Sequence, residues 1–191
     1  MDTLTWELQE PSRIARHPAT VFGAPHGCGN GNSSGICFDG VGDGLLLAVN
    51  PLHGRRRFTC TVEFCPEPDG PAEQRFLHAG TVHQDRALLE LRMNSDGRWY
   101  LDVYLSIAGW SCALRDSSRL HTAGRWYSAT LAFDGRELSG AVDGVTELRR
   151  AAALPDGYSP LSGDHCSIGM RQNQVSFFRG AIRRIVWSTE P

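Results

Sequence analysis

Seven Asp-Gly pairs are distributed along the chain, and they limit its possible folds more than any other feature. Asp-Gly is a preferred tight-turn sequence, because both residues tolerate the positive φ angles that such turns require. The segments between the turns are short and rich in Val, Leu, Phe, Trp, Tyr and Thr, which is typical of β-strands. The sequence predicts strands over residues 36–38, 44–49, 58–65, 74–80, 87–93, 99–106, 126–133, 137–142, 167–170 and 178–186.

No segment shows a convincing helical pattern with capping residues; the best candidate, residues 147–154, is short. Strands without helices between them form antiparallel sandwiches or barrels. We therefore predict an all-β fold, a two-sheet antiparallel jelly-roll sandwich. Residues 1–35 have scattered glycines among polar residues, so we expect an irregular Gly-rich N-terminal segment within one domain of residues 1–191.

The formal net charge of -2 over 191 residues provides no field that would attract nucleic acid or a membrane surface. We expect neither as a partner. The N-terminus has no basic start and no apolar stretch, so we expect a cytoplasmic protein. A mature secreted protein would have the same sequence, so that alternative stays open.

The six cysteines show no spacing typical of zinc sites or redox motifs, and a chain of this length does not need disulfides to fold. We expect reduced, mostly buried thiols. His78 with His83, and the segment 164–166, also fail to supply a structural-zinc ligand set. The sequence predicts no metal site and no cofactor.

Four segments resemble the laminin-G-like jelly-roll family, which belongs to the concanavalin A-like lectins and glucanases and is widespread in bacteria. These are residues 38–43, 58–64, 126–144 and 178–187, in the order that the family has. The resemblance implies a concanavalin-like sandwich. It leaves the activity open, because relatives with this sandwich include sugar-binding modules, adhesion domains, glycosidases and polysaccharide lyases. Arg183 and Arg184 follow Ile182 where the family often has an acidic residue, so a calcium site is not supported.

The hairpin over residues 86–105 is the segment most informative about function. Side chains alternate between the two faces of a strand. One face is apolar and is predicted to be core: Leu89, Leu91, Met93, Trp99, Leu101, Val103 and Leu105. The other face is predominantly polar: Leu88, Glu90, Arg92, Tyr100, Asp102 and Tyr104.

The simplest register of this hairpin places Glu90 opposite Asp102 and Arg92 opposite Tyr100, with Leu88 facing Tyr104. Two carboxylates would then be cross-strand neighbours about 5 Å apart at Cβ, a separation compatible with the acid pair of retaining sugar hydrolases. The tyrosines offer flat surfaces for stacking a sugar ring.

The preceding strand is unusually polar. Simple alternation places Gln74, Phe76 and His78 on one face, and Glu73 and Arg75 on the other. His78 is the best-placed candidate for proton transfer, because the ordinary pKa of histidine lies near neutrality.

Later in the chain, Arg171 could hold the carboxylate of an acidic sugar through its planar guanidinium, or it could be a rim charge.

Three functions remain possible. The first is recognition of a carbohydrate or similar polyhydroxylated small molecule on a polar concave sheet face, with Arg75, Arg92, Tyr100, Tyr104 and Arg171 as ligand-binding residues. The second is a metal-independent glycosidase or lyase on the same face, with Glu90, Asp102 and His78 as catalytic residues. The third is a structural or protein-interaction module, with loops at one end of the sandwich as the contact surface. The polar hairpin face would then be the solvated face of a half-exposed sheet, in which Arg92 bridges the acids and the tyrosines are half buried.

Overall fold

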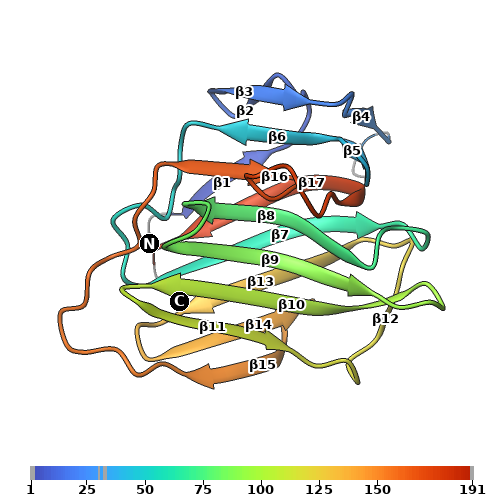
Figure 1. The fold of residues 1–191 in the computed structure, drawn as a ribbon. Coiled ribbons are helices and arrows are strands. Elements are labelled where there is room, and N and C mark those ends of the chain that lie inside the picture. Colours follow the sequence, from blue (N-terminus) through green and yellow to red (C-terminus); the bar gives the residue numbers. More distant parts are fainter. Residues whose placement is uncertain (1–2, 30, 32–33, 190–191) are drawn as a thin grey trace.

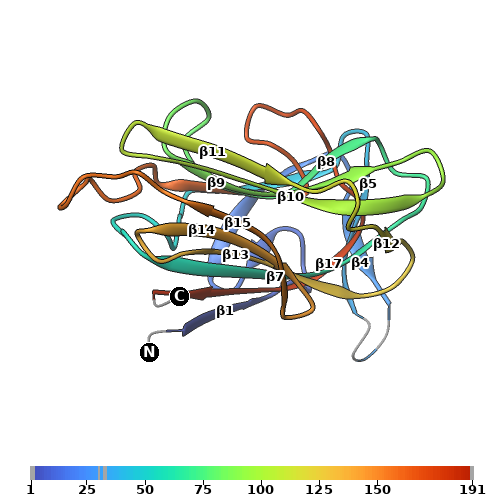
Figure 2. The same cartoon turned by 90° about the horizontal axis from the view of Figure 1, so that it is seen from below.

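The computed structural model describes residues 3–29, 31 and 34–189 and folds them into two antiparallel β-sheets that pack face to face (Figure 1, Figure 2). No α-helix occurs in these ranges. The predicted all-β sandwich is confirmed. None of the described residues belongs to a helix long and apolar enough to cross a membrane.

One sheet has eight strands in the order β15-β14-β13-β7-β17-β5-β4, and β1 pairs with β17. Thr3 of β1 lies opposite Ser188 of β17, so the two ends of the described chain are neighbours. The strands of this sheet are β1 (Thr3–Glu7), β4 (His26–Cys28), β5 (Gly35–Asp39), β7 (Phe58–Pro66), β13 (Tyr127–Phe133), β14 (Glu137–Val142), β15 (Val145–Ala151) and β17 (Arg179–Ser188).

The other sheet has nine strands in the order β11-β10-β9-β8-β16-β6-β3-β2, and β12 pairs with β10. Consecutive hairpins place β8, β9, β10 and β11 side by side, as the green and yellow-green arrows of Figure 1 show. The strands of this sheet are β2 (Arg13–Ile14), β3 (His17–Phe22), β6 (Gly44–Leu47), β8 (Glu73–Gly80), β9 (Arg86–Met93), β10 (Arg98–Ile107), β11 (Trp110–Arg115), β12 (His121–Thr122) and β16 (His165–Ile168).

An aromatic cluster joins the two sheets beneath strands β8 to β10. The Phe64 ring of β7 stacks on Phe76 of β8, with ring centroids 4.4 Å apart. Trp99 of β10 contacts both Phe64 and Tyr127 edge-on. Such aromatic pairs contribute about 0.5–1.5 kcal/mol each beyond the area that they bury. The cluster therefore fixes the inner face of the strands whose outer face carries the candidate site.

The scattered glycines of the N-terminal segment predicted an irregular region, and this prediction was wrong. Residues 3–28 contain β1, β2, β3 and β4, while residues 1, 2, 30, 32 and 33 lie outside the described residues. Trp6 explains the docking of β1, because its side chain is fully buried and contacts Trp187 edge-on at 5.1 Å. Residues 147–154, the best helical candidate, lie mostly in the edge strand β15.

Two of the six cysteines form a disulfide, which corrects the expectation of reduced thiols. Cys28 of β4 is bonded to Cys37 of β5, and these neighbouring strands pair antiparallel. The other four cysteines are free, and Cys60 and Cys166 are buried as expected. The bond ties the short N-terminal strand β4 to the eight-stranded sheet.

Candidate functional site

The β9–β10 hairpin has the predicted register. Glu90 lies opposite Asp102, Arg92 opposite Tyr100, and Leu88 opposite Tyr104. The apolar face of the hairpin is buried in the core, as expected. The remaining side chains point to the outer face of the nine-stranded sheet, away from the second sheet. This outer face is therefore the surface on which a site could form.

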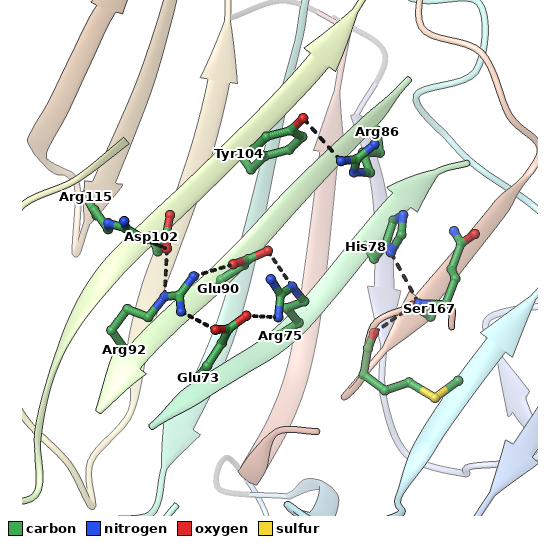
Figure 3. A network of polar contacts seen from close by, with 12 residues as sticks. Glu73, Arg75, His78, Arg86, Glu90, Arg92, Asp102, Tyr104, Arg115 and Ser167 are labelled. Carbon is green, nitrogen blue, oxygen red and sulfur yellow. Dashed lines mark hydrogen bonds and ion pairs between the residues drawn. The ribbon is translucent and has the colours of Figure 1, made fainter. Parts of the chain in front are cut away.

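Five arginine-carboxylate contacts hold the centre of this face together (Figure 3). The Nε atom of Arg92 donates to Asp102 at 2.8 Å, and an Nη atom of Arg92 lies 3.5 Å from Glu90. The Nε atom of Arg75 on β8 donates to Glu90 at 2.7 Å. Glu73 accepts from both Arg75 and Arg92, so one carboxylate links the two guanidinium groups.

The two central acids differ from ordinary surface carboxylates because both are about 2% exposed. Burial raises the pKa of the Glu90 carboxyl from its ordinary value of 4.5 to about 7, although Arg75 and Arg92 act in the opposite direction. The nearby Asp102 carboxylate raises it further. Glu90 therefore holds a proton near neutral pH in a substantial fraction of molecules.

A β-bulge in β8 changes the predicted faces of this strand. Arg75 pairs with Glu90 and Leu77 pairs with Leu89, so one extra residue, Phe76, is inserted between them. The bulge places both Phe76 and Leu77 in the core. His78 consequently lies on the outer face with Arg75 (Figure 3), and not with Phe76 as simple alternation predicted.

His78 is poorly suited to the predicted proton transfer. Its side chain is fully buried, and its Nε2 atom lies 2.8 Å from the carbonyl oxygen of Thr81. Its Nδ1 atom accepts a hydrogen bond from the backbone N–H of Gln172 at 3.3 Å. Burial, together with the nearby charges of Arg171, Arg86 and Arg75, lowers the pKa of His78 from 6.5 to about 4. A neutral ring with both nitrogens engaged has a structural role.

A cavity of about 130 Å³ opens on this outer face above the acid pair. Six of the predicted site residues line it, whereas Tyr100 and His78 do not. Its wall is formed by Arg75, Arg86, Leu88, Glu90, Arg92, Asp102, Tyr104, Ala113, Arg115 and Arg171.

Three of these lining residues were not identified from the sequence. Arg86 shares the face of Leu88 and Glu90, so alternation along β9 could have found it. Its guanidinium lies 4.7 Å above the Tyr104 ring and donates to the Tyr104 hydroxyl at 3.2 Å. Ala113 and Arg115 belong to β11, which was not predicted, and Arg115 approaches Asp102 at 3.5 Å.

A larger cavity of about 300 Å³ lies elsewhere, beside β1 and the end of β17. It is lined by Leu4, Pro51, Leu52 and Trp187, with Arg55 as the one charged side chain among the described lining residues. Size alone does not identify a binding site, and the described lining of this cavity has one charged residue where that of the smaller cavity has seven. We therefore consider the smaller, polar cavity the better candidate.

The described residues contain no group of three or more His, Cys, Asp or Glu side chains that could hold a metal ion. Around the cavity, each carboxylate is paired with arginine, and guanidinium groups repel cations. The donors present here fit an organic ligand better than a cation.

Comparison with known proteins places this fold in a broad group. The family model described as the concanavalin A-like lectin/glucanases superfamily matches residues 39–190. No curated protein sequence matches the chain.

Three solved structures of low sequence identity share the fold. A tailspike protein from an Escherichia coli O157:H7 bacteriophage is 15% identical (TM-score 0.63), over 94% of this chain and 26% of the tailspike. Domain 4 of an extracellular arabinanase from Geobacillus stearothermophilus, solved with arabinotriose, is 15% identical (TM-score 0.60), over 93% of this chain and 86% of that domain. A mutant Trypanosoma rangeli sialidase with trans-sialidase activity is 16% identical (TM-score 0.67), over 98% of this chain and 31% of the sialidase. The chain spans only about a quarter of the tailspike.

Proposed function

Since this chain belongs to the concanavalin A-like lectin/glucanase superfamily, we propose that it recognises a saccharide in the cavity on the outer face of β8 to β11. The observation that carries the proposal is the composition of the cavity wall, where the Tyr104 ring stands among arginine hydrogen-bond donors. Sugars combine ring faces that pack on aromatic side chains with hydroxyls that accept hydrogen bonds. Arabinotriose in the arabinanase domain supports a saccharide as the partner.

The acids and the arginines have different roles in this proposal. Glu90 and Asp102 are nearly buried and paired with arginines, so they hold Arg75 and Arg92 in fixed orientations. Preorganised donors lose less conformational entropy on binding than free side chains do. In this arrangement, the carboxylates are positioning residues and the guanidinium groups contact the ligand.

A steric block of the cavity tests the proposal. Ala113 is exposed, lines the cavity and lies opposite Tyr104 on β11, so Ala113→Trp fills the space without disturbing the core. Ser111 is exposed two residues earlier on the same face and does not line the cavity, which makes Ser111→Trp the matched control.

The measurement is binding of the protein to a glycan array of neutral and acidic oligosaccharides, followed by titration calorimetry on each hit. We expect wild type and Ser111→Trp to bind the same glycans and Ala113→Trp to lose at least about tenfold in affinity, or about 1.4 kcal/mol. The absence of any glycan bound by wild type would overturn the proposal, and unchanged binding by Ala113→Trp would place the ligand elsewhere.

A second candidate function is hydrolysis or elimination of the bound saccharide, and the raised pKa of Glu90 favours it. A carboxyl with a raised pKa beside a second carboxyl is the arrangement of a general acid and its partner. Incubation of each bound glycan with the protein, followed by mass spectrometry, distinguishes the two functions. Cleavage that Glu90→Gln abolishes supports catalysis, whereas an unchanged glycan supports recognition alone.

A further inference from the structure

We infer that the cavity takes an acidic saccharide, whose carboxylate or sulfate group is held by the guanidinium groups of Arg86 and Arg171. This inference rests on the proposed saccharide function and specifies the class of ligand. It follows from the excess of positive charge around the cavity and from the guanidinium groups of Arg86 and Arg171, which form no ion pair among the described residues.

The cavity wall is strongly cationic. Its charged residues are five arginines and two carboxylates, Glu90 and Asp102. Glu73 joins the network from outside the wall, and Glu90 is neutral part of the time near pH 7. Positive charge is therefore in excess at this point on the surface, although the whole chain carries a net charge of -2.

The arginines divide into two groups according to their partners. Arg75 and Arg92 are each bonded to two or more carboxylates. Arg86 and Arg171 form no ion pair among the described residues, and the Nε atom of each is buried without a hydrogen-bond partner there. Buried donors normally have partners, so two guanidinium groups without a carboxylate at one cavity mark positive charge that the described chain leaves uncompensated.

The two arginines also repel each other and their neighbours. Burial lowers the pKa of the Arg171 guanidinium, and Arg75 and Arg86 lower it further through their charges. An anion in the cavity beside them would offset this repulsion. A guanidinium group binds carboxylate or sulfate oxygens through parallel hydrogen bonds, a geometry that neutral hydroxyls do not match.

The size of the cavity agrees with a charged group and part of a sugar ring. About 130 Å³ is several times the space of one water molecule, which is roughly 30 Å³. The remainder of an oligosaccharide would extend toward Arg115, which is 56% exposed on the other side of the acid pair from Arg86 (Figure 3).

Matched pairs of glycans test the inference. The probes are sialyllactose with lactose, tri-galacturonate with its carboxyl-reduced form, and sulfated lactose with lactose, each titrated into the intact chain. We expect the acidic member of at least one pair to bind at least about tenfold more tightly than its neutral partner, and to weaken as salt is raised. The first two pairs report on carboxylates and the third reports on sulfate.

Two variants connect this preference to the inferred residues. Arg171→Gln and Arg86→Gln should each lower affinity for the acidic glycan about 10- to 100-fold, the range for a hydrogen bond to a charged group. Arg171→Lys keeps the charge but loses the planar fork, so it should restore only part of the affinity. Arg98→Gln, which removes an exposed arginine of the same sheet outside the cavity, is the control.

The outcomes separate this inference from the proposed function. Equal binding of acidic and neutral members, if Ala113→Trp blocks it, overturns the inference and leaves saccharide recognition intact. Acidic glycans that bind Arg171→Gln and Arg86→Gln as tightly as wild type also overturn it. Binding of no glycan overturns saccharide recognition itself. Arg171→Gln removes no ion pair among the described residues, and thermal melting confirms that each variant is folded before titration.

Discussion

Glu90 lies directly opposite Asp102 in the β9–β10 hairpin, so two buried carboxyl groups are cross-strand neighbours. Like charges in this position destabilise a sheet unless other groups compensate them. Arg92 supplies this compensation, because it contacts both acids at once. The pair thus contributes to stability only as part of a network that also includes Arg75 and Glu73.

Asp102→Ala should lower the free energy of unfolding by about 2–4 kcal/mol. The change leaves Arg92 without its 2.8 Å partner, and removing one member of a buried ion pair is costly. Asp96→Ala is the control, because its pair with Arg98 is solvent-exposed and should contribute little to stability. Urea unfolding of both variants measures the difference. Equal losses would contradict a stabilising role for the buried network.

Glu90→Gln should change the pH dependence of stability. The folded pKa of Glu90 is raised from 4.5 to about 7, so the folded state keeps a proton that the unfolded chain releases. Glu90 therefore makes the free energy of unfolding fall as pH rises between about 4.5 and about 7, by about 1–3 kcal/mol in total. Urea unfolding at intervals across this range should show that Glu90→Gln lacks this fall. The same slope in variant and wild type would contradict the raised pKa.

His78→Gln should change the pH dependence of the free energy of unfolding in the direction opposite to Glu90→Gln. The folded pKa of His78 is lowered from 6.5 to about 4, so the unfolded chain binds a proton first as pH falls. His78 therefore makes the free energy of unfolding rise with pH between about 4 and about 6.5. In wild type, this rise opposes the fall caused by Glu90.

Unfolding of both variants over one pH series separates the two effects. Relative to wild type, His78→Gln should lose more stability as pH rises through this range, because the rise contributed by His78 is gone and the fall contributed by Glu90 stays. Relative to wild type, Glu90→Gln should gain more stability, because only the fall contributed by Glu90 is gone. Parallel curves for the two variants would show that neither side chain titrates as described.

The sequence predicted the hairpin of the candidate site because its two physical signals agree. Asp96-Gly97 marks the turn, and the alternation of apolar and polar residues on both sides sets the register. Arg92, Tyr104 and the acid pair were therefore placed on one face from the sequence. The position of His78 was wrong, because the bulge at Phe76 breaks alternation and leaves no mark in the residue types.

The missed strands are mostly short or exposed. β11 and β15 are edge strands with many polar residues, which protect a sheet edge from pairing with other chains and also hide its strand pattern. The β10–β11 turn was missed because its first residue, Ala108, is not a typical turn residue. Arg115 and Ala113 of the cavity wall were lost with β11.

The Cys28–Cys37 bond should stabilise the fold by about 2–3 kcal/mol, because it closes a loop with a sequence separation of 9. A double variant, Cys28→Ser with Cys37→Ser, should unfold at correspondingly lower urea concentration, and wild type should match it in strong reductant. Cys112→Ser, which alters a free cysteine, is the control. A disulfide of this kind persists in oxidising compartments and is reduced in the cytosol. A wild type that reductant does not destabilise would contradict a structural role for the bond.

Ala108→Asn should raise the free energy of unfolding by about 0.5–1 kcal/mol. Ala108 and Gly109 join β10 to β11 as a two-residue turn, and both have positive φ angles, 51° and 81°. This is the pattern of a type I′ turn, in which Asn-Gly is strongly preferred and alanine is strained. The Ala108 side chain is exposed, so asparagine meets no steric conflict, and the backbone N–H keeps its bond to Asp85.

A change at the next position, Gly109→Ala, should have the opposite effect and destabilise the fold by about 1 kcal/mol, since it adds a second strained residue. Thermal and urea unfolding of both variants measure these effects. A less stable Ala108→Asn would contradict positive φ angles in the turn that positions β11, the strand that carries Arg115 of the cavity wall.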